Sequence, residues 1–322
     1  MKQNILKSLL LALLLAMLPQ VASAYDFMVD GLCYNKNGDG TSVTLTYEGT
    51  GAEGYGYSNL NGDLVIPPSV TYDGTTYSVT TIGGRAFYGC SGLTSVTIPN
   101  SVTTINYSAF SRCSGLTSVT IPNSVTTIGE GAFYGCSGLT SVTIPNSVTT
   151  IGSSAFEGCT GLTSVTIPNS VTTINYAAFY GCSSLTSVTL GKSVTTIGTG
   201  AFYGCTGLTS IKSKVLNPDK VSMYSSVFYE VDKSNCTLYV PQSTKGVYQA
   251  TPQWSAFVNI VEVPFASGDV NYDDECTGSD VTALYNFILY NDNSAIVNGD
   301  QNGDGEVTGS DVTAVYNIIL GL

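Results

Sequence analysis

The residues best suited to chemistry are acidic and lie in two copies of one short segment. Residues 269–280 read DVNYDDECTGSD, and residues 300–311 read DQNGDGEVTGSD, 31 positions later. In each copy, positions 1, 3, 5 and 12 carry carboxylate or amide oxygens, and position 7 offers a backbone carbonyl. Oxygen donors at this spacing suit a hard cation, above all Ca²⁺. The candidate ligands are Asp269, Asn271, Asp273, Glu275 and Asp280 in the first loop and Asp300, Asn302, Asp304, Glu306 and Asp311 in the second.

An amphipathic segment follows each loop and would hold it in place. Apolar residues recur there at positions i, i+3, i+4, i+7 and i+8, which form one face of a helix. Thr277 and Thr308 stand at loop position 9, where a side chain can reach the cation through water. The alternative is an acidic linker rich in turns, but two copies with matching helices argue against it. The matched faces are Val281, Leu284, Tyr285, Ile288 and Leu289, and Val312, Val315, Tyr316, Ile319 and Leu320.

The rest of the chain offers little for catalysis. It has no histidine, which removes Ser–His and Cys–His nucleophile pairs and histidine-ligated zinc sites. Glu130 and Glu157 both stand at turns, where a solvated side chain is a simpler interpretation than an acid–base pair. The NKNGDG segment at 35–40 has the composition of a calcium loop but lacks a carboxylate at position 12, so it fits a hairpin turn. The sequence therefore predicts a protein that is not an enzyme.

A 23-residue repeat organises the middle of the chain. The unit CSGLTSVTIPNSVTTIG returns with few changes, and a phenylalanine and a cysteine recur in each copy. Leu116, Val119 and Ile121 alternate as in a strand, Pro122 ends it, and Val125 begins a second extended segment. The GAFYGC fragment that follows suits a single helical turn. The repeated residues are Phe87, Phe110, Phe133, Phe156, Phe179 and Phe202, with Cys90, Cys113, Cys136, Cys159, Cys182 and Cys205.

One such coil cannot bury its own apolar side. Stacking coils at the strand spacing of about 4.8 Å creates a continuous core and pairs the backbone of each strand with its neighbours. We therefore expect a β-rich leucine-rich-repeat type of solenoid with short helical turns, followed by a small α-helical module that carries the calcium loops. Caps at both ends come from a hairpin at Asp73-Gly74 and from a last unit that closes with Tyr248, Trp254 and Phe257.

Nine cysteines raise the question of disulfide bonds. The number is odd and each central coil contributes one, so any pairing would have to run between coils. Cysteines on adjacent coils would lie about 5 Å apart, which permits bridges, but their parallel side chains make regular pairing awkward. We interpret them as buried free thiols that behave as small apolar groups. Metal binding by cysteine is disfavoured because the chain has no CxxC pair.

Charge and composition divide the chain. Residues 1–24 have the charged start, apolar core and small-residue end of a secretory signal peptide, and no later apolar run is long enough to span a membrane. Residues 267–322 hold ten acidic side chains and no Lys or Arg, and no basic surface elsewhere favours nucleic acid. We expect a signal peptide (1–24), an N-terminal cap with a degenerate repeat (25–82), six repeats (83–210), a C-terminal cap repeat (211–264) and the calcium-loop module (268–322).

The repeat resembles the BspA-like leucine-rich repeat proteins of bacterial surfaces. The spacing of AF, C, L, IP and SV and the TLYVP…W…F ending carry this resemblance over residues 26–263. It implies a solenoid that is secreted or held at the cell surface and is used for adhesion or for binding proteins.

Residues 268–320 resemble a dockerin, because aspartate rather than glutamate stands at position 12 and each loop has one flanking helix. The resemblance implies two calcium ions and docking onto a cohesin-like partner. Two departures concern the first loop, where Asp274 replaces the glycine expected at position 6 and Cys276 takes the apolar place that Val307 fills in the second. We therefore predict that the first loop binds calcium more weakly. The residues where dockerins contact cohesin are matched by Gly278, Ser279, Gly309 and Ser310.

Two surfaces of the solenoid are candidates for binding. One is a row of threonines on a strand face, and the other is the edge at the helical turn, where otherwise identical coils differ and tyrosines gather. Exposed tyrosine is frequent at interfaces, although strand propensity and the covering of coil edges would also explain both rows. The rows are Thr97, Thr120, Thr143, Thr166 and Thr189, and Tyr88, Tyr107, Arg112, Glu130, Tyr134, Glu157, Tyr176, Tyr180 and Tyr203.

These features predict a secreted or cell-surface binding or adhesion protein. Its solenoid would bind a protein or another surface ligand, and its C-terminal module would dock in a calcium-dependent way. Two alternatives remain open: a non-catalytic subunit of an extracellular assembly of the cohesin–dockerin type, and a regular threonine face that binds ice or crystals.

Overall fold

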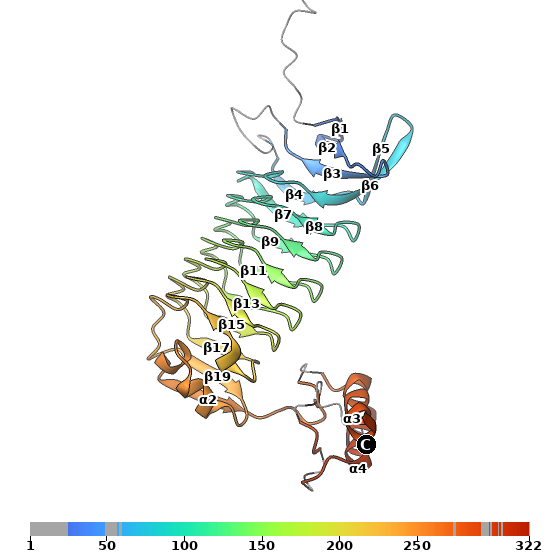
Figure 1. The fold of residues 1–322 in the computed structure, drawn as a ribbon. Helices are drawn as coiled ribbons and strands as arrows, with labels where there is room; N and C mark the ends of the chain where they lie inside the picture. The colour runs from blue at the N-terminus through green and yellow to red at the C-terminus, as the bar shows by residue number, and fades with distance from the viewer. Residues whose placement is uncertain are drawn as a thin grey trace, which may run out of the picture.

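Short strands stacked coil upon coil form the long body of the chain (Figure 1). Eleven strands form one sheet and nine form another within the part of the chain that the structure describes. Strands of successive coils run parallel with partners 23 residues apart, such as Thr104 with Thr127 and Ser141 with Ser164. The expected β-rich solenoid of 23-residue coils is confirmed. The computed structural model describes residues 25–48, 57, 60–272, 275–290, 296, 298–301, 303 and 305–321.

The two sheets occupy two sides of the same coils. The first contains β1 (Phe27–Val29), β2 (Leu32–Lys36), β3 (Ser42–Thr46), β5 (Ser69–Tyr72), β6 (Thr75–Ile82), β8 (Thr104–Ile105), β10 (Thr127–Ile128), β12 (Thr150–Ile151), β14 (Thr173–Ile174), β16 (Thr196–Ile197) and β18 (Ser222–Met223). The second contains β4 (Gly62–Val65), β7 (Leu93–Thr97), β9 (Ser118–Thr120), β11 (Ser141–Val142), β13 (Ser164–Thr166), β15 (Ser187–Leu190), β17 (Ser210–Ser213), β19 (Thr237–Pro241) and β20 (Asn259–Val263).

The repeated apolar residues form one continuous core. Leu116, Val119, Ile121, Val125 and Ile128 of a single coil are all buried, and their equivalents in the other coils are buried as well. The six repeated phenylalanine rings stack along the axis, with neighbouring centroids 5.1 to 5.4 Å apart. Each ring therefore buries its faces against the coils before and after it, so the stability of the stack accumulates coil by coil.

The third side of each coil is a chain of tight turns. Between Gly131 and Cys136, every second N–H donates to the carbonyl three residues back, and the others donate to carbonyls of the next coil. Gly131 and Gly135 have φ values of 57° and 68°. Their N–H groups point along the solenoid axis and donate to carbonyls of the next coil. The expected helical turn thus takes the form of i→i−3 turns that also join neighbouring coils, which a helix bonded only within itself would not do.

Uncharged side chains add bonds between coils. Cys136 Sγ donates to the carbonyl oxygen of Phe110 at 3.1 Å, and Thr117 Oγ1 donates to that of Thr94 at 3.0 Å. All nine cysteines are free thiols, as the sequence predicted, and eight of them are buried. The thiols therefore serve as hydrogen-bond donors as well as apolar filling. Burial raises the pKa of Cys205 to about 12.

Both ends of the stack are closed. At the N-terminal end, β1, β2 and β3 pair antiparallel, and the β5–β6 hairpin turns at Asp73 and Gly74, whose φ values are 49° and 74°. At the other end, η1 (Pro218–Lys220), α2 (Lys245–Ala250) and η2 (Trp254–Ala256) cover the last coils. The expected capping residues Tyr248, Trp254 and Phe257 are all buried there.

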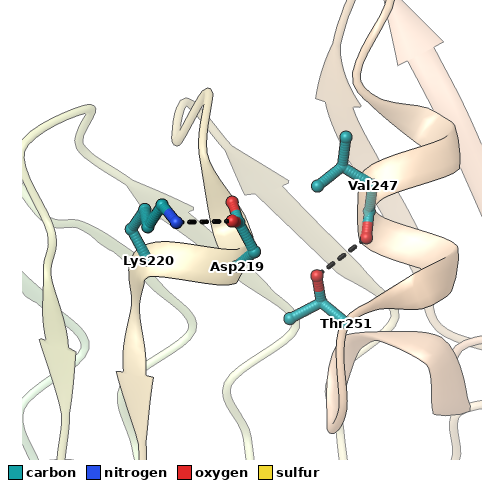
Figure 2. A network of polar contacts seen from close by, with 4 residues as sticks. All are labelled: Asp219, Lys220, Val247 and Thr251. Carbon is teal, nitrogen blue, oxygen red and sulfur yellow. Dashed lines mark hydrogen bonds and ion pairs between the residues drawn. The ribbon is translucent and has the colours of Figure 1, made fainter.

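Two polar contacts on the surface of this C-terminal cap join residues close in sequence. Figure 2 shows the Lys220 ammonium 3.2 Å from the carboxylate of its chain neighbour Asp219 on η1. On α2, Thr251 Oγ1 donates to the carbonyl of Val247 at 2.7 Å. An exposed pair such as Lys220–Asp219 contributes little, so apolar burial and the buried hydrogen bond from the Tyr248 hydroxyl to the carbonyl of Val215, 2.7 Å long, hold the cap on the stack.

Two helices, α3 (Gly278–Tyr290) and α4 (Gly309–Leu320), form the C-terminal module (Figure 1). Only the first half of each predicted apolar face is buried, at Val281, Leu284, Val312 and Val315. The later residues of both faces are exposed, since the helices pack against each other near their starts and no described element covers their last turns. No helix among the described residues has the length and apolar character needed to cross a membrane.

Candidate functional site

The first loop folds back so that its two ends meet at a buried carboxylate. Asp280, at position 12, is fully buried, and Asp269, at position 1, is buried beside the same loop. Asp280 Oδ1 accepts hydrogen bonds from the N–H groups of Val270 at 2.7 Å and Asn271 at 3.1 Å, and Oδ2 accepts from Thr277 at 2.9 Å. Carboxylates in such a place are costly unless a positive charge compensates them.

Among the described residues of this loop, one buried side-chain oxygen has no hydrogen-bond partner. Asn271 Oδ1, at position 3, is buried without a hydrogen bond, whereas its Nδ2 donates to Ser279 Oγ at 3.1 Å. A buried amide oxygen left in this state, next to two buried carboxylates, fits an oxygen-ligated cation such as Ca²⁺. Glu275 is exposed, as a position 7 residue can be when its backbone carbonyl is the ligand.

The second loop has the same closure. Asp311, at position 12, is fully buried and accepts from the N–H groups of loop positions 2 and 9 at 2.7 and 2.8 Å. Asp300 accepts from Gly303 at 2.7 Å and from Gly305 at 2.9 Å, so its carboxylate organises the first half of the loop. Both glycines have positive φ, 76° and 90°, where side chains are disfavoured.

The threonines at position 9 cap the helices. Thr308 Oγ1 accepts from the N–H of Ser310, and Asp311 completes a capping box at the start of α4. Thr277 Oγ1 accepts from the N–H of Ser279 in the same way. These residues therefore position the loops, a role the sequence pattern alone did not indicate. Ser279 and Ser310, together with Gly278 and Gly309, are exposed at the first turn of each helix.

The structure describes some of the predicted calcium ligands and leaves others outside the described residues. Among the residues that the structure describes, no three His, Cys, Asp or Glu side chains lie close enough to form a metal cluster by themselves. The predicted ligands that remain combine carboxylates with an amide and backbone carbonyls, which is the mixed donor set that calcium takes. Predicted ligands outside the described residues are Asp273, Asn302 and Asp304.

The tyrosine edge of the solenoid is continuous only over its last coils. Tyr180 and Tyr203 stack with ring centroids 4.7 Å apart, and Tyr203 stacks on Tyr229 at 4.9 Å. The Tyr203 hydroxyl also donates to Glu230 at 3.1 Å. Tyr229 and Glu230 were absent from the sequence prediction because the coil before them is lengthened, although the match of VFYEV to AFYGC was the signal for them.

Other predicted edge residues are spread out. Tyr107 and Tyr176 are exposed three coils apart, Tyr134 is exposed between them, and the exposed Glu130 lies on a turn near Tyr134. At the first repeats, the guanidinium of Arg112 lies 5.7 Å from the ring centroid of the half-buried Tyr88. Thr97, Thr120, Thr143 and Thr166 are exposed and Thr189 is half-buried, so the expected threonine row is present on the second sheet.

Known families match both parts of the chain. The BspA type leucine rich repeat region, in six copies, matches residues 73–185 and 126–251, which together make more than half of the chain. The Dockerin type I domain matches residues 267–320. None of the curated proteins is similar enough to count as a relative.

Solved structures of bacterial leucine-rich repeat proteins are similar to the solenoid. A leucine-rich repeat protein from Bacteroides ovatus ATCC 8483 is 26% identical, with 74% of this chain and 77% of that chain covered and a TM-score of 0.46. The T. pallidum leucine-rich repeat protein is 29% identical, with 64% of this chain and 90% of that chain covered and a TM-score of 0.54. The chain belongs to the BspA-type leucine-rich repeat family and carries a dockerin type I domain, so it combines two kinds of non-catalytic protein-binding module.

Proposed function

We propose that this chain is a secreted or cell-surface bacterial protein in which the solenoid binds a protein ligand and the module docks onto a cohesin-like partner in the presence of calcium. The observation that carries the proposal is the pair of loops closed on buried Asp280 and Asp311. The dockerin match over the same residues supports it. The proposed export rests on the signal peptide predicted from the sequence at residues 1–24, which lie outside the described residues.

Calcium would bind at two unequal sites. The second loop has glycines at two left-handed positions, 303 and 305, whereas the first has Tyr272 at the former with a φ of 60°. Asp274, the predicted departure at the latter, lies outside the described residues. A residue with a side chain costs roughly 1 kcal/mol in this conformation, which supports weaker binding at the first site. The proposed ligands are Asp269, Asn271, Asp273, Glu275 and Asp280 for the first ion and Asp300, Asn302, Asp304, Glu306 and Asp311 for the second.

The docking surface would be the exposed sides of α3 and α4. The Gly-Ser pairs begin both helices, and apolar side chains such as Leu289 and Leu320, 65% and 66% exposed, lie at their ends. An apolar surface on a soluble module marks an interaction site. Proposed contact residues for a cohesin-like partner are Gly278, Ser279, Gly309 and Ser310.

The solenoid ligand would contact the tyrosine edge. The stacked tyrosines of the last coils, of which Tyr180 and Tyr229 are exposed and Tyr203 is half-buried, offer a rigid surface with apolar faces and hydroxyl groups, which is the composition of binding hot spots. The stacked pair Tyr180 and Tyr203 is the centre of the proposed surface. The outer positions are Tyr88, Tyr107, Tyr134 and Tyr176.

Binding of a purified cohesin module from the producing bacterium tests the module. Titration calorimetry should show binding in calcium, no binding in EDTA, and at least tenfold weaker binding for Ser279→Ala with Ser310→Ala. The control is Thr143→Ala, an exposed change of similar size on the solenoid. Equal binding by the serine variant, or binding in EDTA, would contradict the proposed surface.

A role as non-catalytic subunit of an extracellular assembly is the second candidate, and the dockerin match favours it. The two roles differ in what the solenoid does. Cells or matrix proteins should bind residues 25–264 if adhesion is the role, and this binding should fall when Tyr180 and Tyr203 are both changed to Ala. Binding only through residues 268–322 would favour the assembly role.

A further inference from the structure

One turn of the solenoid departs from the repeat. In four successive coils the turn after the second-sheet strand reads Pro-Asn-Ser, and in the fifth it reads Gly-Lys-Ser, so that Lys192 replaces the asparagine. Lys192 Nζ donates a hydrogen bond to the backbone carbonyl of Asn271, 2.7 Å away in the first calcium loop. The coil that breaks the asparagine row is therefore one that touches the C-terminal module.

The first loop departs from the second at the residue beside this contact. Tyr272 keeps a left-handed backbone where the second loop has Gly303, and yet it is only 4% exposed. Its ring meets Phe265 of the connecting segment edge to face, with centroids 5.0 Å apart. The described residues that form the solenoid core and the module core do not include it. Tyr272 is thus buried at the junction between the two parts.

Tyr272 also lies near the C-terminal cap. Burial raises the pKa of Tyr248, a capping residue whose hydroxyl donates to the carbonyl of Val215 at 2.7 Å, and Tyr272 adds to that rise. The backbone strain at Tyr272 is explained if its ring is needed to fill the space between cap and module. A glycine would relieve the strain but leave that space empty.

Two surface hollows lie beside the contact between Lys192 and the first loop. Lys192 and Glu275 border a hollow of about 400 Å³ with Asn146 and Asn169, and Lys192 and Asn271 border another of about 370 Å³. The first loop therefore lies along the row of coil turns. Charge agrees with this placement, because residues 192–245 hold six of the eleven Lys and Arg of the chain and residues 267–322 hold ten acids without any.

We propose that the first calcium loop is an intramolecular anchor that fixes the module against the last coils of the solenoid, with Lys192 and Tyr272 as the anchoring residues. The two loop copies then have different tasks. The first loop has a tyrosine where a glycine would favour closure of the loop, and this tyrosine packs between the module and the solenoid. The inference rests on contacts within the chain and does not depend on an external partner.

Amide relaxation in the ¹⁵N-labelled full chain with calcium tests the anchor. We expect one rotational correlation time for solenoid and module in the native chain. Lys192→Asn, which restores the residue of the other coils, and Tyr272→Gly, which restores that of the second loop, should each shorten the module's correlation time at least twofold. Lys245→Asn, at an exposed lysine of α2, is the matched control and should change nothing.

Three results would overturn the proposal. The first is independent tumbling of the module in the native chain, and the second is an unchanged rotational correlation time of the module in Lys192→Asn. The third is release of the module by Tyr272→Phe, which keeps the ring. Lys192→Asn lies in the solenoid, so its effect cannot arise from an unfolded module, and the helical circular dichroism of α3 and α4 checks the folding of both Tyr272 variants. Because no partner is added, the outcome is separate from the test of cohesin binding.

Discussion

The solenoid and the module are stabilised by different forces. The solenoid stacks identical apolar coils, so Phe156 has a phenylalanine on both sides and every coil supports the next. The described residues of the module include a core of six buried apolar residues around two short helices, and they include buried carboxylates at Asp269, Asp280 and Asp311. The first part has an interior sufficient for its own folding. The described part of the second has little apolar burial and three buried carboxylates, so we expect its folding to depend on a bound cation.

The difference also explains the composition. Thiols and hydroxyls serve the solenoid because each can donate to a carbonyl of the preceding coil without bringing a charge into the stack, as Cys136 and Thr117 do. In the module the same need for donors is met by backbone N–H groups aimed at carboxylates. Repetition therefore removes charge from one region, and the loops concentrate it in the other.

The largest expected effect comes from removing one ring of the stack. Phe156→Ala should lower the free energy of unfolding of the solenoid by about 3–5 kcal/mol, because it opens a cavity between two neighbouring rings. Urea titration followed by circular dichroism near 215 nm measures it. Thr143→Ala, an exposed change on the same coil, is the control and should stay within about 0.5 kcal/mol. Equal effects of the two changes would mean that the stack is not the main source of stability.

Calcium removal should act mainly on the C-terminal module. At a free calcium concentration of 100 times Kd, the ion stabilises the module by about 2.7 kcal/mol, and EDTA removes this contribution. Calorimetry should therefore show a module transition that shifts to lower temperature and a solenoid transition that shifts far less, because only the anchor contacts join the two parts. A solenoid transition that shifts as far as the module transition would contradict the difference in stabilising forces.

The two loops should respond unequally to loss of the position 12 carboxylate. Asp311→Asn should remove the tighter calcium site and Asp280→Asn the weaker one, with native affinities that differ by about tenfold, or about 1.4 kcal/mol, given the strained backbone of Tyr272. Titration calorimetry of both variants and the native chain gives the assignment. Two equal sites in the native chain would show that the departures in the first loop have no effect on calcium.

Alkaline pH should weaken the solenoid through its thiols. Burial raises the pKa of Cys205 to about 12, above the 9.0 of an exposed thiol, so its contribution is complete below pH 9 and is lost as the pH rises toward 12. We expect a loss of roughly 1 kcal/mol per such thiol at pH 10. Urea titrations at pH 8 and 10 measure it. Cys205→Ala should reduce the loss of unfolding free energy between pH 8 and pH 10. An unchanged loss would exclude this thiol as a cause.

Much of the fold could be predicted because the chain repeats itself. The positions of Phe, Cys, Leu and Val in each 23-residue unit define which side chains are buried, and the structure agrees along the whole stack. The hairpin at Asp73-Gly74 and the capping role of Trp254 were also predictable from local residue types. The conformation of the third side of the coil could not be predicted. Its alternate N–H groups donate to the next coil, and the sequence of a single unit does not indicate that partner.

The calcium loops and their helices are local features, so residue spacing alone determined where Asp280 and Asp311 stand. Spacing also determined the inward residues of the regular repeats, because the periods of strand and repeat are fixed by backbone geometry. Only the tertiary structure decided what remains exposed on α3 and α4, which tyrosines stack, and where the first loop lies. Lys192 and Asn271 are 79 residues apart, and contacts at such separation depend on how whole parts pack together.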